Sequence, residues 1–333
     1  MNSPGFKYAG SLAALVTFAA CSGGSGAAPS SGGMNYQYVG RTLSVNGRLV
    51  TAARLNPVPR YATMVPARHT KSKDFEYIIN DYGTFAGVFD YPKSVKEIGQ
   101  ITNVGGQGCT NVLYGYGKKT FWIVAGDTEI NEYQVPMKPL KTLSDSIGMP
   151  SSCAMDTSGD LAVGILDGSG SGDVVIYQNA SGTPTAYKTP LAEEFFDGYD
   201  NKGNLFADGF TRSNFGLVEL PKGSSTFETI TTSNTVDFPG SVQWDGTYLT
   251  VFDQETNSIY QYTVSGTTAT LEGTVKFQGS SDCAQSWIVK GILYCADAGN
   301  NDGEVFKYPA GGSIIATFTG DFDFPLGTTA AKK

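Results

Sequence analysis

The sequence predicts an all-β protein, a six-bladed β-propeller of four-stranded antiparallel blades closed by a C-terminal inner strand. A unit of about 44 residues recurs from Asp74 to the C-terminus, and residues 240–277 are its clearest copy. Each copy holds four short strand-like runs separated by turns, which is typical of a propeller blade. Helical periodicity is nearly absent, since only residues 191–195 could form a helical turn.

The second strand of each unit gives the register. Four leucines lie at a constant spacing of 44 residues, each just after a turn that contains glycine: Leu161, Leu205, Leu249 and Leu293. Glycine supplies the positive φ that a tight hairpin needs. The third strands give an independent count, because we expect them to end at Tyr91, Tyr133, Tyr177, Leu220, Tyr262 and Tyr308. Both series predict six blades.

Each predicted blade is apolar on both faces, as in residues 174–177. Packing one blade against the next buries both faces, and closing the circle removes the free sheet edges. The C-terminal run that begins at Phe324-Pro325 matches the runs before the inner strands at residues 149 and 238. We therefore expect residues 326–331 to complete the blade formed by residues 75–101. A competing closure would use residues 61–67 as that inner strand.

The N-terminus is typical of an exported protein. Residues 1–20 have a short charged start and an apolar run too brief to span a bilayer, which predicts a signal peptide. The sequence before Cys21 resembles a bacterial lipobox, which implies lipidation at Cys21, although an ordinary signal peptide with an incidental cysteine stays open. Residues 21–33 then form a flexible tether. The expected location is the bacterial cell envelope, at the outer membrane in a Gram-negative host, or otherwise outside the cell.

Charge separates residues 34–73 from the predicted propeller at residues 74–333. The arm carries seven Lys and Arg and no acidic residue, whereas the propeller carries all 31 acidic residues and 15 Lys and Arg. The whole chain has a net charge of −8. We expect the basic arm to pack on the acidic propeller, with contact to anionic lipid as the alternative. An exported, acidic protein is not expected to bind nucleic acid.

Histidine occurs once, at His69 in the basic arm. The predicted propeller therefore has no imidazole for a Ser/His/Asp or Cys/His mechanism or for a histidine-rich zinc site. Carboxylate and metal chemistry stay open.

Four cysteines follow Cys21, and three of them occupy one equivalent position of the inner strands: Cys109, Cys153 and Cys283. A hairpin turning at residues 290–291 places Cys295 opposite Ser286 or Gln285 instead of Cys283. We expect Cys109 and Cys153 to lie on adjacent blades, farther apart than the span of about 7 Å that a disulfide allows between Cα atoms. The sequence thus predicts buried free thiols, with Cys109 and Cys153 as the first pair to test.

An aspartate follows the second strand of every predicted blade: Asp81, Asp127, Asp167, Asp208, Asp253 and Asp297. Repetition in every blade favours Asx-turns, in which the carboxylate accepts backbone N–H groups. The alternative is a ring of carboxylates that binds Ca²⁺.

The inner strands line the axis, where propellers commonly bind ligands. Their polar candidates for a ligand site are Asn111, Asp197, Gln243 and Gln285. The alternative is that these side chains satisfy one another and channel water.

The pattern in residues 150–161, together with third strands that end in Tyr-Pro as at residues 305–309, resembles NHL-repeat and gluconolactonase/regucalcin-like propellers. The resemblance covers about 260 residues and implies an axial divalent metal held by one Glu, two Asn and one Asp in the lactonase-type relatives. Asn111 and Asp197 are the counterparts found in this sequence. No Glu falls on an expected inner strand, and Glu193 and Glu194, which enter the Asp197 strand, fit poorly. The resemblance therefore does not carry over an enzyme activity.

We expect a monomeric, envelope-anchored propeller that binds an unknown protein or small molecule. The alternative is a metal-dependent hydrolase of the lactonase type that uses Asp197 and Asn111 with Ca²⁺ or another divalent metal. A third possibility is an assembly scaffold that acts through the basic arm.

Overall fold

A computed structural model describes strands Thr42–Val45, Arg48–Thr51 and Met64–Val65 and residues 74–333, apart from 81–84, 125–128, 145–147, 167–171 and 213. The predicted signal peptide, Cys21, the tether and His69 lie outside the described residues. Within the described ranges no helix is long and apolar enough to cross a bilayer. The described part is all-β, with a single-turn 3₁₀ helix η1 at Gln178–Ala180.

The sheets repeat one plan of four antiparallel strands. The inner strand pairs with the second strand, the second with the third, and the third with the outer strand. In three sheets the order from inner to outer is β7 (Gly108–Thr110), β9 (Thr120–Val124), β10 (Glu129–Gln134), β11 (Lys138–Ser144); β12 (Met149–Met155), β13 (Leu161–Leu166), β14 (Asp173–Tyr177), β15 (Thr185–Lys188); and β24 (Cys283–Val289), β25 (Ile292–Asp297), β26 (Asp302–Lys307), β28 (Ala316–Phe318).

A nine-stranded sheet contains two such antiparallel runs. They are β16 (Glu193–Tyr199), β17 (Leu205–Phe210), β18 (Phe215–Leu220), β19 (Glu228–Thr232) and β20 (Pro239–Trp244), β21 (Leu249–Asp253), β22 (Ser258–Ser265), β23 (Thr268–Gln278). The outer strands β19 and β23 pair in parallel, and β27 (Gly312–Ser313) pairs with β23.

The C-terminal strand β29 (Pro325–Lys332) pairs antiparallel with β4 (Asp74–Asn80), followed by β5 (Phe85–Phe89) and β6 (Glu97–Thr102). The predicted closure of the chain is thus confirmed. The competing closure is wrong, because β3 (Met64–Val65) pairs with the outer strand β6. β8 (Gly117–Lys118) pairs with β29 in parallel, and β1 (Thr42–Val45) pairs with β2 (Arg48–Thr51). The predicted second strands are also confirmed, since Leu161, Leu205 and Leu249 begin β13, β17 and β21.

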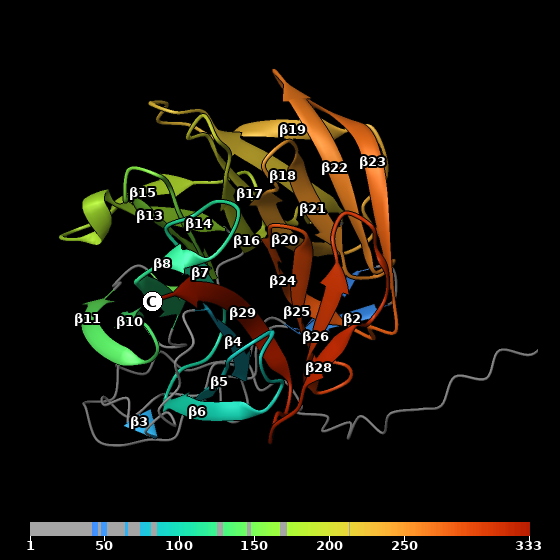
Figure 1. Cartoon of the computed structure of the whole chain (residues 1–333). Coiled ribbons are helices and arrows are strands. Elements are labelled where there is room, and N and C mark those ends of the chain that lie inside the picture. Colours follow the sequence, from blue (N-terminus) through green and yellow to red (C-terminus); the bar gives the residue numbers. More distant parts are fainter. Residues whose placement is uncertain are drawn as a thin grey trace, which may run out of the picture. The chain divides into compact units, whose positions relative to one another are not determined.

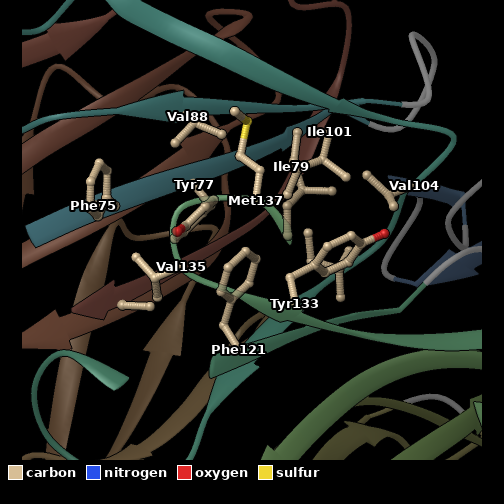
Figure 2. Packing of buried hydrophobic residues seen from close by; sticks show 13 residues of the cluster. Phe75, Tyr77, Ile79, Val88, Ile101, Val104, Phe121, Tyr133, Val135 and Met137 are labelled. Carbon is tan, nitrogen blue, oxygen red and sulfur yellow. The ribbon is translucent and has the colours of Figure 1, made fainter. Parts of the chain in front are cut away.

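Apolar side chains fill the space between neighbouring sheets. Figure 2 shows the cluster between the β4–β6 sheet and the β9–β10 sheet, where the rings of Tyr77 and Phe121 stack with centroids 3.9 Å apart. The hydroxyl of Tyr77 donates to the carbonyl of Pro136, 2.8 Å away. Equivalent clusters join each following pair of sheets, and the last one joins β24–β26 to β4–β5. Each sheet therefore buries both faces against its neighbours.

The inner strands contact one another in the closed sequence β7, β12, β16, β20, β24, β29 and back to β7. Together, the sheets form a propeller-like arrangement (Figure 1).

Candidate functional site

Two glutamines expected to line an axial site are bonded to the backbone of neighbouring strands. The Nε2 of Gln285 donates to the carbonyl of Gly108, and its Oε1 accepts the N–H groups of Gly108 and Thr328. The Oε1 of Gln243 accepts the N–H of Ile288, while its Nε2 donates to the carbonyls of Ile288 and Leu113. Gln285 thus joins β24 to β7 and β29, and Gln243 joins β20 to β24 and to the segment after β7.

Little space is left beside Gln243. The cavity lined by Asp197, Gln243 and Trp287 has a volume of about 20 Å³, which accommodates about one water molecule. Val112 and Leu113, from the segment after β7, also line it, and the indole of Trp287 donates to the carbonyl of Gly115. The segment after β7 thus packs against the inner strands at this point.

The four predicted site residues do not line one pocket. Asp197 and Gln243 both line the small axial cavity, whereas Asn111 and Gln285 are not among its lining residues. The Oδ1 of Asn111 accepts the N–H of Lys118. Asp197, of the predicted metal pair, therefore lines the small axial cavity, and Asn111 does not.

Asp197 belongs instead to a buried carboxyl cluster that the sequence pattern does not reveal. The expectation that no Glu lies on an inner strand is wrong, because β16 begins at Glu193 and includes Glu194. The hydroxyl of Ser152 contacts both Glu194 Oε1, at 3.0 Å, and Asp197 Oδ2, at 2.8 Å. Ser151 contacts Glu194 Oε2 at 3.0 Å. Asp208 on β17 lies close enough to influence both carboxyls.

Burial raises the pKa of all three carboxyls of this cluster, Glu194, Asp197 and Asp208. Glu194 and Asp208 are 0 % exposed, and desolvation, followed by the charge of Asp197, raises their pKa well above the ordinary range. Desolvation raises the pKa of Asp197 to about 7, although the hydrogen bond from Ser152 lowers it in part. Backbone hydrogen bonds from Gly164 and Gly240 lower the pKa of Asp197 and of Asp208, respectively, in part.

A glycine on the neighbouring sheet makes room for this cluster. A Cβ atom on Gly164 would lie 1.8 Å from Glu194 Oε2 and 2.3 Å from the hydroxyl oxygen of Ser152. Any larger residue at this position would displace the carboxyl group.

The aspartates after the second strands do not behave alike. Asp253 and Asp297 accept three and four backbone N–H groups respectively, which confirms the predicted turn role for these two. Asp208 belongs to the carboxyl cluster. The remaining three, Asp81, Asp127 and Asp167, lie outside the described residues.

Of the described aspartates of this series, Asp297 belongs to a group of potential metal ligands. Within the described ranges, only Cys295, Asp297 and Glu304 bring three potential ligand atoms within 4.8 Å of one another. Cys295 is disulfide-bonded and so lacks the thiolate that a metal would need. This group lies on β25 and β26 and not on an inner strand, so it does not match the axial metal set of the lactonase-type relatives.

The prediction of free thiols is wrong, because disulfides join Cys109 to Cys153 and Cys283 to Cys295. The inner strands β7 and β12 converge near the axis, where the Cα atoms of Cys109 and Cys153 are 5.7 Å apart. Cys295 does lie opposite Ser286, as expected, but a register shift after Cys283 leaves the Cα atoms of Cys283 and Cys295 5.6 Å apart.

A cleft of about 370 Å³ lies between the β12–β15 sheet and the β16–β19 sheet. Asp156 and Asp160 line it from the β12–β13 turn, Tyr187 from β15, Tyr199 from the end of β16, and Lys222 from the β18–β19 turn. We call this space the inter-sheet cleft. Its volume falls in the range of about 300–1,000 Å³ that is usual for small-molecule sites.

Several polar groups of the inter-sheet cleft have no hydrogen-bond partner among the described residues. Asp156 uses Oδ1 to accept three turn N–H groups, and Asp160 uses Oδ1 to accept the N–H of Asn179. Within the described residues, neither the Oδ2 atoms of these aspartates nor the hydroxyls of Tyr187 and Tyr199 have a hydrogen-bond partner. Tyr199 is 6 % exposed, and desolvation with the nearby charges of Asp156, Asp197 and Asp160 raises its pKa. The cleft therefore offers both acceptors and hydroxyl groups to a ligand.

Comparison with known proteins bears on the fold alone. No protein-family model matches the sequence, and no curated protein matches it. A chain of a nidogen/laminin complex is similar, with a TM-score of 0.62 and 12% identity over 78% of this chain and 98% of that one. A chain of the mitotic checkpoint complex has a TM-score of 0.50 and 12% identity, covering 79% of this chain and 78% of that one. A protein named "putative 6-phosphogluconolactonase" from Bacteroides uniformis has a TM-score of 0.50 and 10% identity, covering 76% and 84%.

Proposed function

We propose that this chain is a six-bladed β-propeller of the NHL or gluconolactonase/regucalcin-like type that binds a small molecule while anchored to the bacterial cell envelope. The blade count follows from taking each antiparallel run of inner, second, third and outer strand as one blade, with β29 as the inner strand of the first. On this interpretation the parallel pair β19–β23 is a contact between the outer edges of two blades.

The inter-sheet cleft is the observation that carries the binding function. It is far larger than the axial cavity, at about 370 Å³ against about 20 Å³. Four of its polar side chains, those of Asp156, Asp160, Tyr187 and Tyr199, have an oxygen with no hydrogen-bond partner among the described residues. Gln243 and Gln285, in contrast, already bond to backbone groups of other inner strands. A ligand therefore finds both space and unpaired polar groups in the cleft.

The proposed location at the cell envelope is based on the predicted signal peptide and tether in residues 1–33. The disulfides also support it. Disulfides persist in oxidising compartments such as the periplasm and the cell exterior, and two disulfides join the four cysteines that follow Cys21. We propose that lipid attached to Cys21 holds a monomeric propeller at the membrane. Labelling with radioactive palmitate in a bacterial host should mark the wild-type chain and not Cys21→Ser.

Binding is tested with the full-length protein and a small-molecule fraction of spent culture medium, with mass spectrometry of the retained compounds. We expect a compound that wild type retains and Tyr187→Ala loses, while Tyr248→Ala, on the turn between β20 and β21, keeps it. Tyr187 and Tyr248 are both half-buried, but only Tyr187 lines the cleft. Equal retention by all three proteins, or retention by none, would count against a binding function of the cleft.

The alternative function is a metal-dependent lactonase-type hydrolase. The buried carboxyls of Glu194, Asp197 and Asp208 favour it, because a divalent cation would neutralise like charges that raise one another's pKa. The carboxyl cluster does not bring three ligand atoms within 4.8 Å of one another, so its geometry supports no catalytic step through a metal.

Metal analysis of the purified full-length protein separates the two functions. Stoichiometric metal that is lost in Asp197→Ala, together with hydrolysis of glucono-δ-lactone or 6-phosphogluconolactone that is lost in the same variant, would establish the hydrolase. Absence of stoichiometric metal from the wild type after incubation with Ca²⁺, Mg²⁺ or Zn²⁺ would end it.

A further inference from the structure

We propose that the inter-sheet cleft binds a neutral saccharide, a ligand class that deepens the proposed binding function and rests on it. A pyranose ring has two distinct surfaces. Its C–H groups pack against aromatic and aliphatic side chains, and its hydroxyls each donate and accept hydrogen bonds. The cleft presents both kinds of partner.

The apolar wall of the cleft is built by the core. Tyr199, Leu205 and Leu220 are buried members of the cluster that packs between the two sheets, and Ile176 and Tyr187 cover its solvent side. An aromatic side chain gives a large contact area at a low entropic cost because it has only two rotatable bonds. A ligand that lies flat against Tyr187 would therefore gain a large contact area at a low entropic cost.

The polar groups face the same space from the turns. The Oδ1 atom of Asp156 accepts hydrogen bonds from the N–H groups of Ser158, Gly159 and Asp160 at 2.7–2.8 Å. These bonds fix the orientation of the carboxylate and leave Oδ2 for a ligand. A ligand hydroxyl that donates to a carboxylate forms a charge-assisted hydrogen bond, which is stronger than one between neutral groups. The hydroxyl of Tyr199 both donates and accepts, and so suits a neighbouring sugar hydroxyl.

The charged side chains of the cleft lining make charged ligands less favourable than neutral ones. Two carboxylates against the ammonium of Lys222 give the lining a net charge of −1, so the lining disfavours an anionic ligand. Lys222 lies over the turn between β16 and β17, because a Cβ on Gly203 would be 3.3 Å from its Nζ. A cationic ligand would meet this ammonium group. A neutral ligand rich in hydroxyls avoids both conflicts.

The test uses full-length protein and a defined panel of probes. The neutral probes are glucose, galactose, mannose, N-acetylglucosamine, maltose and cellobiose, the anionic probe is 6-phosphogluconate, and the cationic probe is choline. Saturation-transfer NMR detects weak binding, and calorimetric titration gives the dissociation constant. We expect at least one neutral saccharide to bind and both charged probes to fail.

Two variants place a bound saccharide in the cleft. Tyr199→Phe removes a hydroxyl while keeping the buried ring, and we expect it to weaken binding roughly three- to tenfold, the worth of one hydrogen bond. Tyr187→Ala removes the ring and should weaken binding by about tenfold or more. Tyr248→Phe and Tyr248→Ala make the same deletions outside the cleft and should bind like wild type. The thermal midpoint of each variant, measured alongside, shows that it is folded.

Each other result overturns the proposal in a different way. A saccharide that binds Tyr187→Ala and Tyr199→Phe as tightly as wild type does not occupy the cleft. Binding of choline or 6-phosphogluconate that is lost in Tyr187→Ala, without binding of any neutral sugar, overturns the ligand class and leaves the binding function intact. If no probe binds, the saccharide proposal fails, whereas the culture-medium experiment still decides whether the cleft binds another compound.

Discussion

The side-chain amide of Gln285 pairs with the backbone of Gly108 through two reciprocal hydrogen bonds. Its Nε2 donates to the carbonyl at 3.0 Å, and its Oε1 accepts the N–H at 3.1 Å. The same Oε1 accepts the N–H of Thr328 at 2.8 Å. One amide thus connects β24 with β7 and β29, the strands that meet where the C-terminal strand closes the arrangement. Gln285, which the sequence predicts as a candidate for ligand binding, is therefore hydrogen-bonded to the backbone of the strands that close the arrangement.

We expect Gln285→Ala to destabilise the protein by about 3 kcal/mol, because three buried backbone groups would lose their partner. Urea unfolding followed by tryptophan fluorescence measures the change in midpoint. Gln134→Ala, at an exposed position of β10, is the control and should stay within about 0.5 kcal/mol of wild type. A Gln285→Ala midpoint equal to that of the control would show that this amide contributes nothing to closure.

Gly164→Ala should also destabilise the protein, since its Cβ would overlap the carboxyl of Glu194. Overpacking of this kind costs about 1–3 kcal/mol. The double variant Gly164→Ala/Glu194→Ala removes the overlap with the carboxyl and leaves only the overlap with the Ser152 hydroxyl, so the two changes should cost less together than the sum of the single changes. The four proteins of this cycle are compared by urea unfolding. Strict additivity would mean that the glycine is required for another reason.

Strand order could be predicted from the sequence because it depends on local signals. The leucines at 161, 205 and 249 begin second strands, and a Phe-Pro pair at 324–325 marks the start of the closing strand in the same way as at 238–239. Each signal combines a turn that needs glycine or proline with an apolar run, and both are visible within a few residues.

The disulfides and the carboxyl cluster could not be predicted, because they depend on how closely neighbouring sheets approach. Cys109 and Cys153 are joined since their strands converge, a distance that no spacing in the sequence reports. The sequence pattern places Glu194 before its strand and thus assigns it to no site. The consecutive serines 151 and 152, one repeat upstream of Glu194 and Asp197, are the only signal that a polar partner faces that strand.

The inter-sheet cleft was missed for a similar reason. Asp156 ends an inner strand and has the pattern of a turn residue, which it is, since its Oδ1 caps the turn. Tyr187 lies on an outer strand, where an aromatic residue indicates sheet packing. Only the two sheets together bring these side chains to one space.

We expect loss of the disulfide between Cys109 and Cys153 to cost about 4 kcal/mol, and loss of the one between Cys283 and Cys295 to cost about 3 kcal/mol, because the longer loop restricts the unfolded chain more. The two loops span 44 and 12 residues. Paired Cys→Ser variants compared with wild type by urea unfolding give both values. Mass measurement after alkylation without reduction should find no free thiol among these four cysteines in the wild type, and alkylated thiols there would contradict the pairing.

Stability should fall as the pH rises from about 4 to about 7, on account of Asp197. Its pKa is raised from 3.8 to about 7 in the folded protein, chiefly by burial. A carboxyl with a raised pKa binds its proton more tightly in the folded state, so the stabilisation is complete below the unfolded pKa and is lost as the pH rises through the folded one. Glu194 and Asp208, whose pKa values are also raised by burial, act in the same direction.

Asp197→Asn carries no titrating proton and still offers an oxygen to Ser152, so its unfolding midpoint should depend less on pH across this window. Asp321→Asn, at an exposed position, should keep the wild-type profile. Thermal unfolding at several pH values measures all three, and a wild-type midpoint that rises between pH 4 and 7 would mean that the cluster is compensated by a bound cation or another charge.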